Sequence, residues 1–141
     1  MGPVTGRCSC GAVRFQLCGP RSGISFCHCS RCRRASGGQP LGHIIVAASS
    51  LVWDGIPRLA RWTAPSGYGR VFCPICGSPA PDAIFDDRAY RVPVGLLDDV
   101  ALVVTEHIYV DSEAPWDPDA DEAPRYPGDG PARDDLPDLD P

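Results

Sequence analysis

The sequence predicts a mainly β protein with short antiparallel strands, one or two short helical turns and a small core held by bound metal. Three observations carry this prediction. The chain has 15 glycines and 16 prolines among 141 residues, which favours short strands joined by turns over a helix bundle. Short apolar runs recur between these turns. Eight cysteines fall in closely spaced groups, a pattern typical of metal sites.

In the first part of the chain, two strands precede one short helix. Residues 12–18 alternate between apolar and polar side chains, which predicts a strand, and residues 24–27 predict a second one. Residues 29–36 predict two turns of helix. Gly37 and Gly38 follow as the stop signal, because glycine readily adopts the backbone conformation that ends a helix.

The rest of the apolar chain predicts further short strands separated by turn residues. They fall at 43–48, 51–53, 58–62, 69–73, 83–85 and 90–94. Residues 100–110 fit a strand or a helix by pattern, and their valine and isoleucine content favours a strand.

Charge divides the chain into two parts. Residues 111–141 hold eleven acidic side chains and two arginines, although the whole chain carries a net charge of only −5. We place a metal-binding domain over residues 1–116. Residues 117–141 are interpreted as an acidic, proline-rich tail that is partly disordered. A net acidic chain argues against a nucleic-acid partner, and the absence of lysine excludes a lysine Schiff base.

The sequence gives no sign of membrane insertion or export. No apolar run approaches the ~20 residues that a membrane span needs, and the N-terminal residues lack a basic and then apolar signal pattern. We therefore expect a cytoplasmic protein without a membrane partner. A reducing compartment favours metal binding by the cysteines over disulfides.

Two cysteine pairs predict a closed metal site. Cys73 and Cys76 flank a Pro-Ile dipeptide and precede a glycine, as in a zinc knuckle, and Cys8 and Cys10 form the second pair. Four thiolates in a tetrahedral set select zinc first, with iron–sulfur as the main rival. Such a site would tie distant segments together and contribute folding energy directly.

Cys27, Cys29 and Cys32 form a separate group of three thiols. Three protein ligands and one open position are the arrangement of a catalytic zinc. A fourth ligand could instead close the site, the candidates being Cys18, His28 and His43. On an extended segment the side chain of His28 would point away from the flanking thiols, which favours a packed, proton-shuttling or supporting role.

Five ordered motifs resemble the glutathione-dependent formaldehyde-activating enzyme (GFA) family, also called the centromere protein V family. They are Cys8-x-Cys10-Gly11, CHCSRCRRASG (27–37), FCPICGS (72–78), VGLLDD (94–99) and HIYVDSEAPW (107–116). The resemblance covers about residues 6–116 and implies an Mss4-like, β-rich zinc fold. It also implies one structural zinc and one catalytic zinc per chain. The implied structural ligands are Cys8, Cys10, Cys73 and Cys76, and the implied catalytic ligands are Cys27, Cys29 and Cys32.

The activity implied by the resemblance is that of a carbon–sulfur lyase. Formaldehyde, or a related aldehyde, would condense reversibly with glutathione or another small thiol such as mycothiol. Three thiolates on zinc need nearby positive charge. Arg33 shares a helix face with Cys29, so we expect it among the catalytic residues, and Arg31, Arg34 and Arg70 are nearby alternatives.

Two other functional interpretations stay open at the level of sequence. The chain could be a non-enzymatic zinc-stabilised binding module whose acidic tail recruits a partner. It could also be a thiolate cluster for metal handling or redox sensing. An open fourth position on the group of three cysteines favours the enzyme, and a filled one favours the module.

Overall fold

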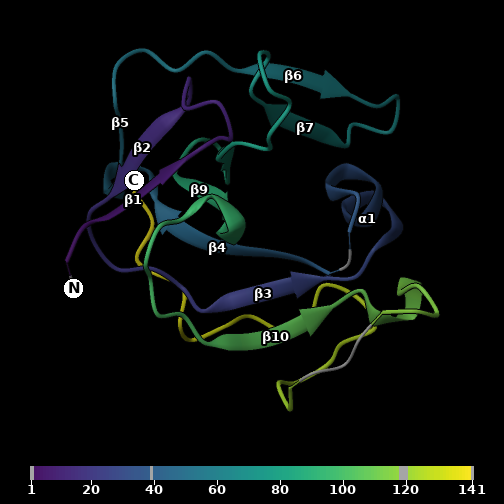
Figure 1. Ribbon diagram of the computed structural model, residues 1–141. Helices are drawn as coiled ribbons and strands as arrows, with labels where there is room; N and C mark the ends of the chain where they lie inside the picture. Colours follow the sequence, from purple (N-terminus) through teal and green to yellow (C-terminus); the bar gives the residue numbers. More distant parts are fainter. Residues whose placement is uncertain (1, 39, 118–120, 141) are drawn as a thin grey trace.

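The computed structural model describes residues 2–38, 40–117 and 121–140 and confirms a mainly β protein (Figure 1). The described part contains one α-helix, α1 (Ser30–Ser36), and ten strands. The strands are β1 (Val4–Arg7), β2 (Arg14–Leu17), β3 (Ile24–Cys27), β4 (Leu41–Ala47), β5 (Leu51–Trp53), β6 (Ala60–Thr63), β7 (Gly69–Phe72), β8 (Asp82–Ile84), β9 (Ala89–Pro93) and β10 (Val104–Ile108). Three single-turn 3₁₀ helices lie at Ala48–Ser50, Val94–Leu96 and Val110–Ser112.

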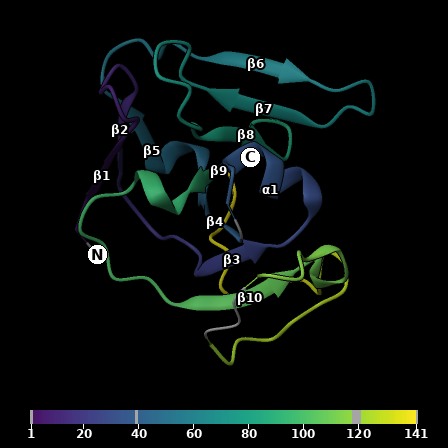
Figure 2. The ribbon, with the colours of Figure 1, turned by 45° about the vertical axis from the view of Figure 1, so that its right-hand side comes forward.

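The strands form three sheets. The largest has the order β10-β3-β4-β9-β8, a second has the order β1-β2-β5, and β6 pairs with β7 in a hairpin. All pairs are antiparallel except β3 with β10, which run parallel. In both ribbon views α1 lies between the β6–β7 hairpin and the β3–β10 edge of the large sheet (Figures 1 and 2).

The main core lies between the large sheet and the three-stranded sheet. Alternation along β4 decides which side chains enter it, because successive residues of a strand point to opposite faces. Ile44 and Val46 are fully buried on the core face. They pack with Val92 of β9 and with Phe15 and Leu17 of β2. Residues 41, 43 and 45 of β4 therefore face the other side of the sheet.

A second, smaller core surrounds the two cysteine pairs. Its buried members are Cys8, Val13, Val71, Cys73 and Ala80. Two of these five side chains are thiols, so this region has little apolar surface of its own to bury. A metal ion bound by these thiols would add stability that this small core lacks.

The predicted elements agree with the structure where local signals were strong. The strands at 24–27 and 51–53 have the predicted bounds, and the helix begins after Cys29 and ends at Gly37 in the left-handed conformation. The long run at 100–110 forms a strand only over β10. Strand β1 was not predicted, because its four residues include Gly6 and carry little apolar pattern. No described helix is both long enough and apolar enough to cross a membrane.

We call residues 121–140 the C-terminal strap. Its first part runs beside β10, where the amide of His107 donates to the carbonyl of Pro124 at 2.8 Å and the amide of Tyr126 donates back at 2.9 Å. At its far end the carboxylate of Asp140 accepts a 2.7 Å hydrogen bond from the hydroxyl of Ser49. The domain boundary at residue 116 and the partial disorder of the tail stay predictions.

Candidate metal and thiol-binding site

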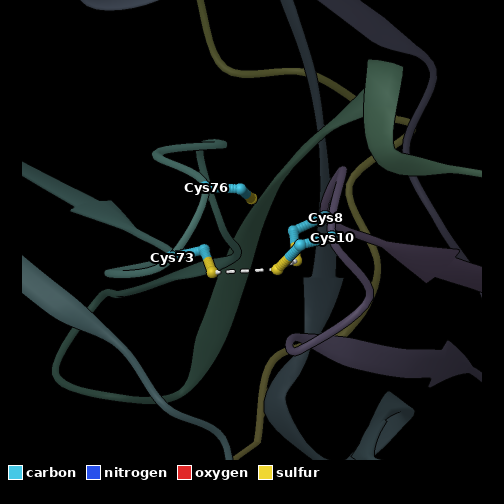
Figure 3. A group of neighbouring side chains, drawn as sticks. All are labelled: Cys8, Cys10, Cys73 and Cys76. Atoms are coloured by element: carbon cyan, nitrogen blue, oxygen red, sulfur yellow. Dashed lines mark hydrogen bonds between the residues drawn. The ribbon is translucent and has the colours of Figure 1, made fainter.

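The two cysteine pairs converge on one point. Cys8 and Cys10 lie in the turn after β1, and Cys73 and Cys76 lie in the loop after β7 (Figure 3). The four sulfur atoms all lie within 4.8 Å of one another. The Cys8–Cys10 and Cys10–Cys73 sulfur distances are 3.7 and 3.8 Å.

These distances fit a tetrahedral zinc ion. With zinc–sulfur bonds of about 2.3 Å, the sulfur–sulfur edge of a tetrahedron is about 3.8 Å. The backbone also supplies donors that suit thiolates. The amide of Val13 donates to Cys8 Sγ at 3.3 Å, and hydrogen bonds with Ser78 lower the pKa of Cys76 to about 5. This group can therefore hold a metal ion with all four positions filled by protein.

The second group, Cys27, Cys29 and Cys32, is positioned by the junction of β3 and α1. Cys27 ends β3 and is buried, Cys29 is the residue that caps the helix, and Cys32 lies in its first turn. The amide of Cys32 donates to Cys29 Sγ at 3.2 Å. Interaction with Cys32 lowers the pKa of Cys27 to about 6, and the positive charge of Arg91 contributes. The three sulfur atoms lie within 4.8 Å of one another and can also hold a metal ion.

Among the described residues, no fourth cysteine, histidine or carboxylate joins this group of three. Cys18 is exposed beyond the end of β2, and its sulfur belongs to neither cysteine cluster. His43 lies on β4, opposite Ser25 of β3, and is not part of the group. His28 is fully buried, and its ring takes part in a separate hydrogen-bonded chain.

That chain runs through two histidines. His28 Nδ1 bonds to Asp117, His28 Nε2 lies 2.7 Å from His107 Nδ1, and His107 Nε2 lies 2.9 Å from Asp121 Oδ1. His107 also stacks on Phe26 at 5.6 Å between ring centroids, and Phe26 precedes Cys27 in β3, so the two side chains point to opposite faces of the sheet. The prediction that His28 points away from its neighbouring thiols agrees with these contacts.

His28, Glu113 and Asp117 are close enough to be considered as ligands of a further metal. Two contacts argue against this assignment. His28 and Asp117 are already bonded directly, and Arg125 donates to Glu113 Oε2 at 2.6 Å, which places a fixed positive charge beside the cluster. We interpret this series of hydrogen bonds as a structural support. It ties the segment after β10 to His28, directly after the strand that bears Cys27.

The group of three cysteines lies in the wall of a cavity of about 790 Å³. The floor of the cavity is the non-core face of the large sheet, and its side chains follow from strand alternation. They include Ser25 and Cys27 of β3, His43 of β4, Arg91 of β9 and Glu106 of β10. Helix α1, strand β7 and the C-terminal strap complete the walls. The size suits a small organic ligand.

The chain matches a known protein family over most of its length. The model of the glutathione-dependent formaldehyde-activating enzyme (GFA) family matches residues 3–112. The chain belongs to the GFA family. A crystal structure of a Rhodobacter sphaeroides protein is similar in fold, with a TM-score of 0.54 and 25% sequence identity over 69% of this chain and 90% of that one. No curated protein matches the chain significantly.

Several arginines line the cavity of this GFA fold. Arg31 and Arg70 line the cavity, and Arg70 donates to the carbonyl of Ala35 at 2.9 Å. Arg33, the predicted catalytic cation, is half-buried on α1 and is not among the lining residues, so its role stays a prediction. Arg91 was not singled out from the sequence, because β9 reaches the site only through its pairing with β4.

Proposed function

We propose that this protein is a zinc-dependent carbon–sulfur lyase of the GFA type. It would condense formaldehyde, or a related small aldehyde, reversibly with glutathione or another small thiol. The observation that carries the proposal is the placement of Cys27, Cys29 and Cys32. They line a ligand-sized cavity as a set of three thiols that gains no fourth ligand from the described residues. We expect two zinc ions per chain, one in each cysteine group.

The reaction needs a thiolate and a polarised carbonyl. The sulfur of the thiol forms a bond to the aldehyde carbon, the carbonyl π electrons move to oxygen, and the proton lost by the thiol ends on that oxygen. A free thiol with a pKa near ~8.5 is mostly protonated at neutral pH. Zinc held by Cys27, Cys29 and Cys32 would supply the positive charge that keeps the substrate sulfur deprotonated.

Positive side chains must offset the charge gathered at this site. Three cysteine thiolates and one substrate thiolate bring four negative charges against two on a zinc ion. Arg91 is well placed to help, because its charge acts on Cys27 and its side chain lines the cavity. Among the described residues, Arg91 forms no ion pair with a carboxylate. Its positive charge can therefore act on the thiolates of the site. Arg31 contributes from α1, where it lies over the ring of Tyr68 at 5.5 Å.

Tyr68 is the candidate hydrogen-bond donor to the aldehyde oxygen. Burial, together with the Cys32 and Cys29 thiolates, raises its pKa, so the phenol keeps its proton at neutral pH. Its side chain lines the same cavity as the three thiols. It can therefore stabilise the negative charge that develops on oxygen as the carbon–sulfur bond forms.

Replacement of Tyr68 by phenylalanine should separate this role from packing. We expect kcat to fall about a hundredfold to a thousandfold, because one donor to the developing oxyanion is lost. The zinc content should stay the same, and the KM for the thiol should change less than twofold. Wild-type kcat in Tyr68→Phe would remove Tyr68 from the mechanism.

The proposed activity is tested directly with zinc-loaded protein and ¹³C-labelled formaldehyde. Glutathione, cysteine and 2-mercaptoethanol would be supplied in turn, and exchange between free and thiol-bound formaldehyde would be followed by NMR. We expect catalysed exchange with at least one thiol, above the rate of the same mixture without protein. If the protein contains two zinc ions and accelerates none of these exchanges, the lyase proposal fails and the binding-module interpretation gains.

A further inference from the structure

The C-terminal strap forms part of the cavity wall. Residues 129–133 and Leu136 line the cavity together with the cysteines of β3 and α1. The GFA family match ends at residue 112, before the strap begins. This wall is therefore not part of the matched family pattern.

Arg133 attaches the strap to the floor of the cavity. Its guanidinium lies 3.4 Å from Glu106 Oε1, donates to both carboxylate oxygens of Asp135 at 2.7 Å, and donates to the carbonyl of Gly23 at 3.0 Å. Its side chain is only 13% exposed. The amide of Gly23 donates in return to Asp135 at 2.6 Å. These contacts hold the strap across the start of β3.

Glu106 is the more deeply buried of the two carboxylates beside this cation. Its side chain is 6% exposed, and it accepts a 2.9 Å hydrogen bond from the hydroxyl of Ser25. Among the residues that the structure describes, Arg133 is the only positively charged side chain in ion-pair contact with Glu106. His43 does not supply a second positive charge here. Burial, together with the charges of Arg91 and Arg133, lowers the pKa of His43 to about 3, so its ring is neutral.

The Arg133–Glu106 pair lies within reach of a substrate held at the thiols. Glu106 is paired with Ser25 across β3 and β10, and Cys27 lies two residues further along the same face of β3. Two residues of a strand span roughly 7 Å. A thiol compound of tripeptide size that bonds through its sulfur near Cys27 would therefore place its polar end beside this pair.

We propose that Arg133 is a specificity-determining residue for the thiol substrate. It lies between the carboxylates of Glu106 and Asp135 and offsets one of these two negative charges, and it thereby allows the cavity to accept thiols that carry carboxylates, as glutathione does. This inference rests on the proposed function, because it assumes a thiol bound at the three cysteines. Without Arg133, the buried carboxylate would face the carboxylates of the substrate. With an effective dielectric constant between those of a protein surface and of water, loss of one positive charge beside the substrate changes the affinity for an anionic thiol by about tenfold.

The test compares thiols of different charge on zinc-loaded protein. Dissociation constants for glutathione, neutral 2-mercaptoethanol and cationic cysteamine would be measured by isothermal titration calorimetry. The variants are Arg133→Ala, Glu106→Gln and the double variant. Asp140→Ala is the matched control, since it loosens the far end of the strap at Ser49 without changing the charge at Glu106.

We expect Arg133→Ala to weaken glutathione about tenfold, to change 2-mercaptoethanol less than twofold and to strengthen cysteamine. The double variant should recover glutathione affinity to within about threefold of the wild type, because loss of Glu106 and Arg133 together leaves Asp135 as the one negative charge and so restores the net charge of the wild-type group. Asp140→Ala should leave the ratio of the three affinities unchanged.

Two results would overturn the inference while leaving the proposed function intact. One is equal weakening of all three thiols in Arg133→Ala, which would make the strap a purely structural wall. The other is no recovery in the double variant. A wild-type protein that binds none of the thiols would instead refute the proposed function itself, and this inference with it.

Discussion

Replacement of Cys76 by serine is expected to unfold the protein. Cys76 supplies one of four sulfur atoms that lie within 4.8 Å of one another. A metal ion bound by all four would link the turn after β1 to the loop after β7. The apparent binding free energy of structural zinc in small domains is about 10–16 kcal/mol, as large as the whole stability of a typical domain. The small core around this site has too few apolar side chains to compensate.

The measurement is thermal unfolding followed by circular dichroism, with zinc content determined on the same samples. Cys18→Ser is the matched control, because Cys18 is exposed and belongs to neither cysteine cluster. We expect no cooperative transition for Cys76→Ser and a wild-type curve for Cys18→Ser. A folded Cys76→Ser protein with one zinc fewer would show that the four-cysteine site does not hold the fold together.

The grouping of the cysteines could be predicted from the sequence, because it depends largely on local spacing. Cys73 and Cys76 are three positions apart in a turn that Gly77 completes with a left-handed φ of 77°, and glycine adopts this conformation without strain. Likewise, Cys29 and Gly37 mark the two ends of α1, and the structure places both there. The two distant cysteine pairs could be assigned to one site because a structural zinc needs four ligands.

The charges around the thiols could not be predicted in the same way. Arg33 was selected by helical spacing, whereas Arg91 comes to the cavity on β9, which pairs with β4. Glu106 and Arg133 meet only because β10 pairs with β3 and the strap crosses the same face. Such neighbours are set by long-range strand pairing, for which short motifs carry no signal.

The acidic composition of the C-terminal part also gave no sign of the specific ion pairs that its two arginines form. Eleven acidic residues against two arginines predict a solvated, partly disordered segment. Both arginines, however, make ion pairs in the structure, Arg125 with Glu113 and Arg133 with Glu106 and Asp135. A net charge averages over a segment, whereas a binding site depends on the position of single charges.

Replacement of Cys29 by serine is expected to abolish the activity and leave the fold intact. Cys29 caps α1 through its sulfur, and serine is among the best helix-capping residues, so the hydroxyl can accept the amide of Cys32 in its place. The group of three thiols would lose one ligand. We expect zinc content to fall from two ions to one per chain and the thiol–formaldehyde exchange rate to fall at least about a hundredfold.

A comparison with Cys29→Ala separates the two roles of this side chain. Alanine removes both the ligand and the helix cap, so it should lower the free energy of unfolding by about 1 kcal/mol more than serine does, with the same loss of activity. Melting curves, zinc content and exchange rates of both variants provide the measurement. If Cys29→Ser lost its cooperative transition as Cys76→Ser is expected to, the division into a structural site and a catalytic site would be wrong. If it kept both zinc and activity, the open site would lie elsewhere in the cavity.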